Sequence, residues 1–520
     1  MRARNHKFGL LLSVTLAGMA VLIIEIIAIR MLAPFFGNSI FTISSVIGII
    51  LAALGLGYHL GGSLADRRPS AAWFFSLIVI AGFSVLLLQF FNAIVLPGIA
   101  YRLSLIDGPL IVSLLMFFLP AFFLAMLSPF AIALLHAREA DRGVGHASGS
   151  VFFWSTLGSI AGSLGTGFLL IPHWGIGNIV IGVGSGLVLL GGVGLLTTRM
   201  SPKILPVGLV LAGLIGGIAL GRVGTVDGRS DVFAADGLYE RIVIRDIPYR
   251  GRTARVLLQD LNISGGLYLD DGSMAFDYTK YYDLYRLFTP RLRTALAIGG
   301  GAYSVPRSIL QHSPGAIVDV AEIDPSLHWL AIRYFALPED SKLRNHAIDG
   351  RRFLHDTAER YDLVFSDAYR SFVSAPAQFT TVEFFRLAKS RLREDGVLIA
   401  NFYGSLAPDT RAPIYSALRT MRAVFPQVYA IATVSPGSEE LQNFILIGHN
   451  ASNRDRRIDL RRAAAVDFAY PMLKGVAALE LRPADASLDS HAVLTDDYAP
   501  VEYYAANAIR RYDVVSGRAR

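Results

Sequence analysis

Residues 295–304 read Ala-Leu-Ala-Ile-Gly-Gly-Gly-Ala-Tyr-Ser, an apolar strand that runs directly into a glycine-rich turn. Glycine lets the backbone approach a ligand closely and adopt angles that are closed to other residues. The next predicted strand, Ile317–Ala321, ends in Glu322, at the spacing where an acidic side chain can accept hydrogen bonds from both hydroxyl groups of a ribose. The two features together predict a nucleoside site at the first βα turn of an α/β domain.

Strand and helix patterns alternate around and beyond this turn. We expect helices at Val305–His312 and Leu327–Phe335, and further strands at Asn345–Ile348, Leu363–Ser366, Val397–Phe402, Val428–Thr433 and Phe444–Ile447. Such alternation is typical of a mostly parallel sheet with helices on both faces. Upstream, short strands at Arg241–Arg245, Ala254–Gln259 and Leu267–Leu269 are separated by polar turns and predict a small β-strand subdomain.

The first part of the chain is almost free of charge. Between Ala71 and His136 the only charged side chains are Arg102 and Asp107. A bilayer core of about 30 Å needs about 20 apolar residues per helix. We expect seven spans, near Phe8–Ala33, Phe41–Gly62, Ala72–Leu96, Leu110–Leu135, Val151–Ile171, Ile176–Leu196 and Ile204–Leu220. Glycines four residues apart, Gly57 with Gly61 and Gly158 with Gly162, favour a compact helix bundle.

The overall composition excludes several classes of protein. Only 17% of the 520 residues are charged and 53% are hydrophobic, whereas charged residues make up about a quarter of a typical soluble domain. The chain has no cysteine, so disulfides, thiolate zinc sites and iron–sulfur clusters are excluded, and we expect no metal site. The net charge of +7 includes a basic tail, but no base-reading motif accompanies it, so we expect no nucleic-acid partner.

Basic residues in the short loops predict the orientation of the bundle, because Lys and Arg mark the cytoplasmic side. They gather on one side of the predicted spans, at Arg2, Arg4, Lys7, Arg67, Arg68, Arg138, Arg142, Arg199 and Lys203. Seven spans place everything after Arg222 on the other side. The nucleoside chemistry argued below instead favours a cytoplasmic domain on a multi-pass inner-membrane protein, so the two expectations conflict.

Two ionisable residues inside the first predicted span, Glu25 and Arg30, bear on transport. Such residues are costly in a membrane and often functional. The structural alternative is that Glu25 pairs with a polar group and fixes packing, while Arg30 reaches the interface. We favour this alternative.

Two more predicted strands also end in acidic residues. Asp349-Gly350 follows the third strand of the α/β series, and Asp367 follows the fourth. One such acid is often only a helix cap, but four successive strand ends carrying glycines, Glu322, Asp349 and Asp367 favour a binding site. The phosphate-binding pattern Gly-x-x-x-x-Gly-Lys-Ser/Thr is absent from the sequence. An adenosine without phosphate, such as S-adenosylmethionine or its decarboxylated form, therefore fits best.

With these motifs in place, the sequence resembles the spermidine synthase family of aminopropyltransferases, and most closely its multi-pass membrane-bound bacterial members. The resemblance is carried by Leu238-Tyr239-Glu240-Arg241-Ile242, Leu267-Tyr268-Leu269-Asp270, Tyr281-Tyr282-Asp283, Gly299-Gly300-Gly301 and Leu494–Glu502. It implies that Gly299, Gly300, Gly301 and Glu240 contact the nucleoside, that Glu322 binds ribose and Asp349-Gly350 adenine, and that Asp367 is the catalytic acid.

The resemblance also implies the chemistry. In the family, a neutral primary amine attacks the carbon beside the sulfonium of decarboxylated S-adenosylmethionine and releases methylthioadenosine, as in the conversion of putrescine to spermidine. The donor is a co-substrate, and no tightly bound cofactor is implied. An amine is protonated at neutral pH, so a carboxylate at the point of attack is needed to accept its proton. We assign this role to Asp367.

Several positions depart from the family pattern, mainly on the acceptor side. Ala302 stands where the family has an Asp that binds the aminopropyl amine, and Arg370 where it has a second Asp. The family Gln is Glu240 here, and the His of its Tyr-His-Glu segment is Tyr282. Because two acids are lost and a guanidinium is gained, a dicationic amine would bind less well. We keep Tyr282, Asp283 and Arg370 as acceptor-site candidates.

Three functions therefore remain: aminopropyl transfer to putrescine or a related amine; S-adenosylmethionine-dependent transfer to a different or lipid-borne acceptor; and a non-catalytic nucleoside-binding module on a transporter-like bundle. The expected fold is a membrane α-helical bundle (1–222), a small β subdomain (223–290), a Rossmann-like methyltransferase/spermidine synthase domain (291–450) and a C-terminal extension packed on it (451–520). The expected partners are the lipid bilayer and the small-molecule nucleoside and amine substrates. Self-association into a homo-oligomer is left open.

Overall fold

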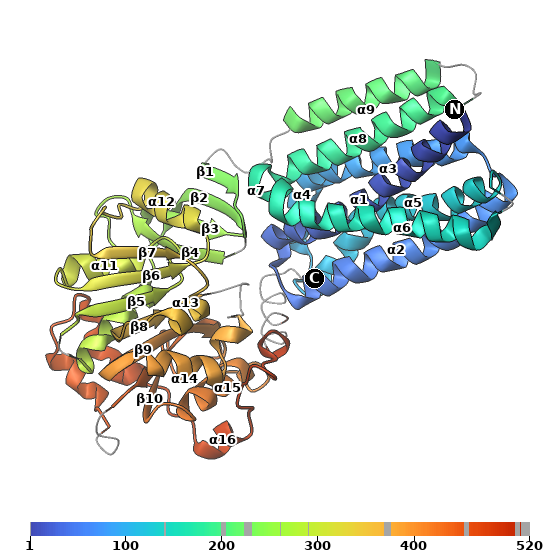
Figure 1. The fold of residues 1–520 in the computed structure, drawn as a ribbon. Coiled ribbons are helices and arrows are strands. Elements are labelled where there is room, and N and C mark those ends of the chain that lie inside the picture. Colours follow the sequence, from blue (N-terminus) through green and yellow to red (C-terminus); the bar gives the residue numbers. More distant parts are fainter. Residues whose placement is uncertain are drawn as a thin grey trace. The chain divides into compact units, whose positions relative to one another are not determined.

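The computed structural model describes residues 2–510 except 140–141, 199–203, 223–230, 261, 290, 369–375, 452–456 and 505–509. These residues divide into two compact units, an N-terminal unit of helices and a second unit that begins with the first strand at Asp231 (Figure 1). Each unit is described by itself.

Long apolar helices build the first unit. They are α1 (Arg2–Phe36), α2 (Ile40–Arg67), α3 (Ala71–Phe90), α5 (Gly108–His136), α6 (Gly143–Gly165), α8 (Ile176–Thr197) and α9 (Ile204–Arg222). Short pieces extend α3 and α6: the π-helical segments η1 (Phe91–Val95) and η4 (Thr166–Leu170), α4 (Leu96–Ile99), the 3₁₀ turn η2 (Ala100–Arg102) and α7 (Ile171–His173).

Among the described residues, six of these helical stretches are long and apolar enough to cross a membrane. The apolar stretch of α9, Pro206–Leu220, is shorter. A membrane-embedded N-terminal region is therefore supported, while the number seven stays a prediction.

Glycines bring the helices of the first unit close together, as their spacing indicates. A Cβ atom at Gly158 of α6 would lie 1.9 Å from the carbonyl oxygen of Thr15 in α1. A Cβ atom at Gly61 of α2 would lie 2.7 Å from the Cα atom of Met126 in α5. Only a residue without a side chain allows backbones to approach this closely.

The second unit contains two sheets. The first is antiparallel, with strands in the order β1 (Asp231–Asp236), β2 (Arg241–Tyr249), β3 (Arg252–Gln259) and β4 (Asn262–Tyr268). Strand β1 was not expected from the sequence, because its residues are mostly exposed and show no apolar face. Strand β4 begins earlier than predicted, and it includes two consecutive glycines, Gly265 and Gly266, which are poor strand formers.

The second sheet has seven strands in the order β10-β11-β9-β8-β5-β6-β7. Its strands are β5 (Thr294–Ile298), β6 (Ile317–Glu322), β7 (Leu343–Ala347), β8 (Tyr361–Ser366), β9 (Leu392–Gly404), β10 (Gln427–Ala432) and β11 (Gln442–His449). Strands β5 to β9 pair in parallel, and β11 pairs antiparallel with both β9 and β10. The predicted mostly parallel sheet is confirmed.

Helices cover both faces of the large sheet (Figure 1). They are α11 (Ser304–His312), α12 (Pro325–Tyr334), α13 (Gly350–Asp356), α14 (Val382–Ser390) and α15 (Ala412–Arg422), with α10 (Asp277–Lys280) and the 3₁₀ helix η5 (Tyr281–Leu287) preceding β5. Alternate residues of β5 enter different cores, Ala295 and Ala297 on one face and Leu296 and Ile298 on the other. This alternation is what a strand buried on both faces requires.

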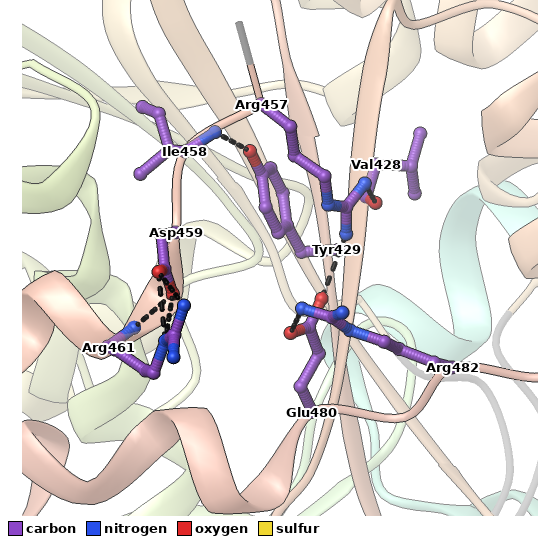
Figure 2. Close-up of polar contacts among 8 residues, drawn as sticks. All are labelled: Val428, Tyr429, Arg457, Ile458, Asp459, Arg461, Glu480 and Arg482. Carbon is purple, nitrogen blue, oxygen red and sulfur yellow. Dashed lines mark hydrogen bonds and ion pairs between the residues drawn. The ribbon is translucent and has the colours of Figure 1, made fainter.

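The C-terminal segment from Arg457 to Arg482 covers the edge strand β10. It contains the 3₁₀ helices η7 (Leu460–Ala465) and η8 (Pro471–Leu479), and α16 (Asp485–Asp489) follows it. Arg457 donates to the Val428 carbonyl at 3.0 Å, its guanidinium lies 4.1 Å from the centre of the Tyr429 ring, and Glu480 accepts from both Arg457 and Arg482 (Figure 2). Covering an edge strand prevents pairing with other chains.

Candidate functional site

Four strand ends converge at one edge of the large sheet. The amide of Asp367, after β8, donates to the Ile298 carbonyl at the end of β5 at 3.0 Å, and the amide of Ile348, after β7, donates to the Glu322 carbonyl at the end of β6 at 3.2 Å. Strand β5 lies between β6 and β8, which is where the strand order reverses. Open α/β sheets bind ligands at this switch point. The structure therefore brings the predicted strand-end residues together.

The glycine-rich turn needs glycine for both conformation and space. Gly299 and Gly301 have φ angles of +87° and +50°. A Cβ atom at Gly301 would lie 2.2 Å from the carbonyl oxygen of Ser264 in β4. The same Ser264 carbonyl accepts the amide of Ala302 at 3.0 Å, so β4 holds the turn from outside the large sheet.

Replacing Gly301 with alanine tests this fit. We expect Gly301→Ala to destabilise the protein by about 2–5 kcal/mol, because a left-handed backbone is strained for alanine and the new methyl group collides with backbone. Gly315→Ala is the control, since a Cβ atom there meets nothing within 4 Å. Thermal unfolding of the purified variants measures the difference, and equal melting temperatures would contradict the assigned constraint.

Tyr303 packs against the glycine-rich turn. The sequence analysis did not identify it as a candidate site residue. It has a left-handed φ of 54°, is fully buried, and donates from its hydroxyl to Asn345 Oδ1 in β7 at 2.5 Å. A Cβ atom at Gly300 would lie 2.5 Å from the Tyr303 ring. A bulky residue in this conformation is uncommon, and such residues cluster at functional sites.

Glu322 is held by backbone amides of the turn. Its Oε2 accepts from the Gly300 amide at 2.7 Å and its Oε1 from the Asp324 amide at 2.9 Å. The side chain is only 6% exposed, and burial raises the pKa of this carboxyl, while the amide donors oppose the shift. A carboxylate has about four lone-pair sites, so each oxygen retains capacity for another donor, such as a ribose hydroxyl.

Asp349 caps a helix as well as facing the same edge. Its Oδ1 accepts from the amides of Arg351 and Arg352, both at 3.0 Å, at the start of α13. The structure therefore shows the capping role weighed in the sequence analysis, and neither of these two bonds uses Oδ2. The residue after Asp349 needs to be glycine, because a Cβ atom at Gly350 would lie 2.3 Å from Ile298 Cγ2.

Asp367 lies against two neutral donors. Asn401 Nδ2 of β9 donates to its Oδ1 at 2.9 Å, and the Tyr278 hydroxyl of α10 is a second hydrogen-bond partner. The residue as a whole is half-buried, and the packing around its carboxyl raises the pKa of Asp367 to about 6, although both hydrogen bonds lower it. A carboxyl with this pKa is ionised at neutral pH and can accept a proton.

Tyr278, rather than Tyr282, is the tyrosine that reaches Asp367. Burial, followed by the nearby Asp367, raises the pKa of Tyr278 well above its usual range. Tyr278 belongs to the α-helical turn that ends at Lys280, whereas Tyr282 belongs to the 3₁₀ helix, with about three residues per turn, that follows it.

The structure places the acceptor-site candidates Tyr282 and Asp283 in the protein core. Tyr282 is 1% exposed, and its hydroxyl is 2.8 Å from Ser308 Oγ. Asp283 is fully buried, pairs with Arg286 at 2.7 Å and accepts the Ala469 amide at 2.7 Å. These contacts give both residues a structural role, and their part in binding an acceptor stays a prediction.

The remaining candidates stand as follows. Glu240 accepts from Gln259 Nε2 at 2.9 Å, and the turn that carries it approaches Asp324, since a Cβ atom at Gly237 would lie 3.1 Å from Asp324 Oδ2. Arg370 lies outside the described residues.

Ala302 is 3% exposed and packs against Gly265, so its position offers a methyl group where a charged side chain was expected from the family. In the described part of the chain, no three His, Asp or Glu side chains form a metal-binding group.

The fold and the site define a class of protein: an α/β protein with a glycine-rich turn, two acids at adjacent strand ends and a further carboxyl group packed beside the turn. Residues 283–457 match the family model of the spermine/spermidine synthase domain. The match covers about a third of the chain, and it supports a transferase enzyme with a spermidine synthase-like domain.

Similar proteins match the chain over different lengths. A polyamine aminopropyltransferase of Aquifex aeolicus is 24% identical over 495 residues, which cover 88% of this chain and 93% of the relative. A probable polyamine aminopropyl transferase of Bifidobacterium longum is 29% identical over 244 residues, 44% of this chain, and the match spans about half (53%) of the relative's length. The solved structure of a probable spermidine synthase from Corynebacterium glutamicum aligns with 50% of this chain and 92% of its own, with 21% identity and a TM-score of 0.41.

Proposed function

We propose that the second unit transfers an aminopropyl group from decarboxylated S-adenosylmethionine to a primary amine and releases methylthioadenosine. The observation that carries this proposal is the Asp367 carboxylate, which lies beside the glycine-rich turn with a pKa raised to about 6. Glu322 and Asp349 at the neighbouring strand ends supply acceptors for the ribose hydroxyls and the adenine amino group. We assign Glu240 and Gly350 to the same nucleoside pocket.

The proposed step is a displacement. The acceptor enters as an ammonium ion and gives one proton to the Asp367 carboxylate, which frees the nitrogen lone pair. That lone pair attacks the carbon bonded to the sulfonium, a C–N bond forms, and the C–S bond breaks with its electron pair passing to sulfur. The neutral thioether then leaves as methylthioadenosine. Most of the remaining acceleration comes from alignment of the two substrates, because a sulfonium is already a good leaving group.

A second candidate keeps the nucleoside site and changes the acceptor or the donor. The buried Ala302 favours it, since the residue provides no charge to an aminopropyl ammonium group. Intact S-adenosylmethionine, whose carboxylate Arg370 could bind, and an amine-bearing lipid headgroup both fit this case. Incubating the purified protein with each donor, with and without putrescine, decides between them: methylthioadenosine in the products indicates alkyl transfer, and S-adenosylhomocysteine indicates methyl transfer.

We also propose that the second unit lies on the membrane face opposite to the basic loops, in a multi-pass protein of the inner membrane. Helix pairs support seven crossings. Gly192 and Gly217 bound the contact between α8 and α9: a Cβ atom at Gly192 would lie 2.0 Å from Val210 Cγ2, and one at Gly217 would lie 2.7 Å from Ser185 Oγ. From the first contact to the second, the residue numbers decrease along α8 and increase along α9. The two helices are therefore antiparallel. Residues 223–230 are too few to cross a bilayer again.

Single cysteines test this orientation, because the chain has none of its own. Ser490→Cys reports on the second unit, Ala137→Cys on a basic loop and Asp107→Cys on the opposite loop. We expect a membrane-impermeant maleimide to label Ser490→Cys and Asp107→Cys in intact spheroplasts, and Ala137→Cys only after permeabilisation. Labelling of Ser490→Cys only together with Ala137→Cys would place the second unit in the cytoplasm, as the chemistry first suggested.

A further inference from the structure

Behind Asp367 runs a chain of two asparagine side chains. Asn443 Nδ2 donates to Asn401 Oδ1 at 2.9 Å, and Asn401 Nδ2 donates to Asp367 Oδ1 at 2.9 Å. The three residues come from β11, β9 and the end of β8, which are neighbours in the sheet. Asn401 is only 5% exposed, so its amide is screened from water. Neither asparagine was a candidate in the sequence analysis.

The first asparagine sets the orientation of the second. An asparagine amide has an oxygen that only accepts and a nitrogen that only donates. Asn443 places its donating nitrogen against Asn401, so Asn401 must turn its oxygen toward Asn443. Its nitrogen then faces Asp367. In the reverse orientation, the Asn401 oxygen would face a carboxylate oxygen, and two acceptors would repel each other unless the carboxyl were protonated.

The orientation of Asn401 matters because no charged group of the described residues contributes to the pKa of Asp367. Burial favours its protonated form, and the groups that oppose burial in the described part of the chain are the neutral Asn401 amide and the neutral Tyr278 hydroxyl. A carboxyl that is already protonated cannot accept a proton from an ammonium ion. Loss of one of two donors is therefore a large change for this base.

We propose that Asn443 is a positioning residue that acts through Asn401 to keep Asp367 ionised and to fix which of its oxygens faces the substrate. The inference rests on the proposed function, in which Asp367 is the base. Asn401 directs its donor to Oδ1, which leaves Oδ2 for the incoming amine. Asn443 itself touches neither Asp367 nor the substrate, so its effect is seen in protonation rather than in binding.

The test is Asn443→Leu, which keeps much of the side-chain volume and removes the donor. We expect the acid limb of the pH profile of kcat/KM to move upward by about one pH unit. For a shift of one unit, activity falls about fivefold at pH 6 and about twofold at pH 7, while KM for the nucleoside changes by less than twofold and activity recovers at pH 9. Thr433→Val is the matched control: it removes a 3.0 Å side-chain bond to the Asn443 carbonyl and leaves the amide chain intact, so its acid limb stays in place.

Infrared titration provides a readout that does not need turnover. The difference between the wild type and Asp367→Asn isolates the C=O band of this carboxyl, whose midpoint we expect near pH 6, and Asn443→Leu raises that midpoint while Thr433→Val does not. An unchanged midpoint in Asn443→Leu, or an activity loss that is equal at every pH, overturns the proposal. Absence of transfer by the wild type with a raised midpoint in Asn443→Leu would instead overturn the proposed function and leave the asparagine chain in place.

Discussion

Asp367→Asn is expected to lower kcat by about 10²–10⁴-fold, the usual contribution of a general base, while affinity for methylthioadenosine changes little. The amide keeps the shape of the carboxylate and cannot take the proton of the attacking ammonium ion. Calorimetry with methylthioadenosine, beside a turnover assay, separates the two effects. Retention of more than a tenth of wild-type kcat would exclude Asp367 as the base.

The pKa of Asp367 also predicts two pH dependences. Because the carboxyl must be ionised to act, kcat/KM should fall below pH 6 with a slope of one.

The stability of the fold changes with pH in the opposite direction. A carboxyl whose pKa is raised from 3.8 to about 6 stabilises the fold below pH 3.8, and that contribution is lost as pH rises through 6. Asp367→Asn should therefore be more stable than the wild type at pH 8 and not at pH 4.

Glu322→Gln is expected to weaken nucleoside binding by about 100-fold or more, and it is the second large effect. Each charge-assisted hydrogen bond to the ribose contributes about 1.5–3 kcal/mol. In addition, the glutamine NH₂ group must face the amide of either Gly300 or Asp324, which now donate to the two carboxylate oxygens. We therefore expect a lower melting temperature as well as weaker binding.

The matched control for Glu322→Gln is Glu359→Gln, because Glu359 is an exposed acid of the same unit. Calorimetry should find its affinity for methylthioadenosine within twofold of that of the wild type. If Glu322→Gln bound methylthioadenosine as tightly as this control, the ribose role would be wrong and only the structural role in the turn would remain. A lower melting temperature with unchanged affinity would lead to the same conclusion.

Most of the fold and part of the site could be predicted from local patterns. Strands β5, β6 and β8 fall within about two residues of their predicted bounds, since uninterrupted apolar runs next to glycine and acidic residues are strong local signals. The parallel pairing of these strands and of β7 then places Glu322, Asp349 and Asp367 at one edge of the sheet. Strand β1 escaped prediction because it lies at a sheet edge and most of its residues are exposed.

The surroundings of Asp367 could not be predicted, because they depend on which distant segments become neighbours. Tyr278 reaches the carboxyl from α10, a segment far from Asp367 in the chain, and no local pattern links the two residues. Tyr303 braces the turn from a left-handed conformation that its residue type disfavours. Such local conflicts persist when tertiary packing compensates for them.

By itself, the sequence determined the apolar helices, the succession of strands along the chain and the acidic residues that end three of these strands. These features depend on residues near one another in the chain. Only the tertiary structure decided what surrounds the base. Asn401 and Asn443 are 42 residues apart, and they meet because β9 and β11 pair antiparallel in a register that sets Ile445 opposite Asn401. That register comes from the packing of two sheet faces at once, so no local pattern contains it.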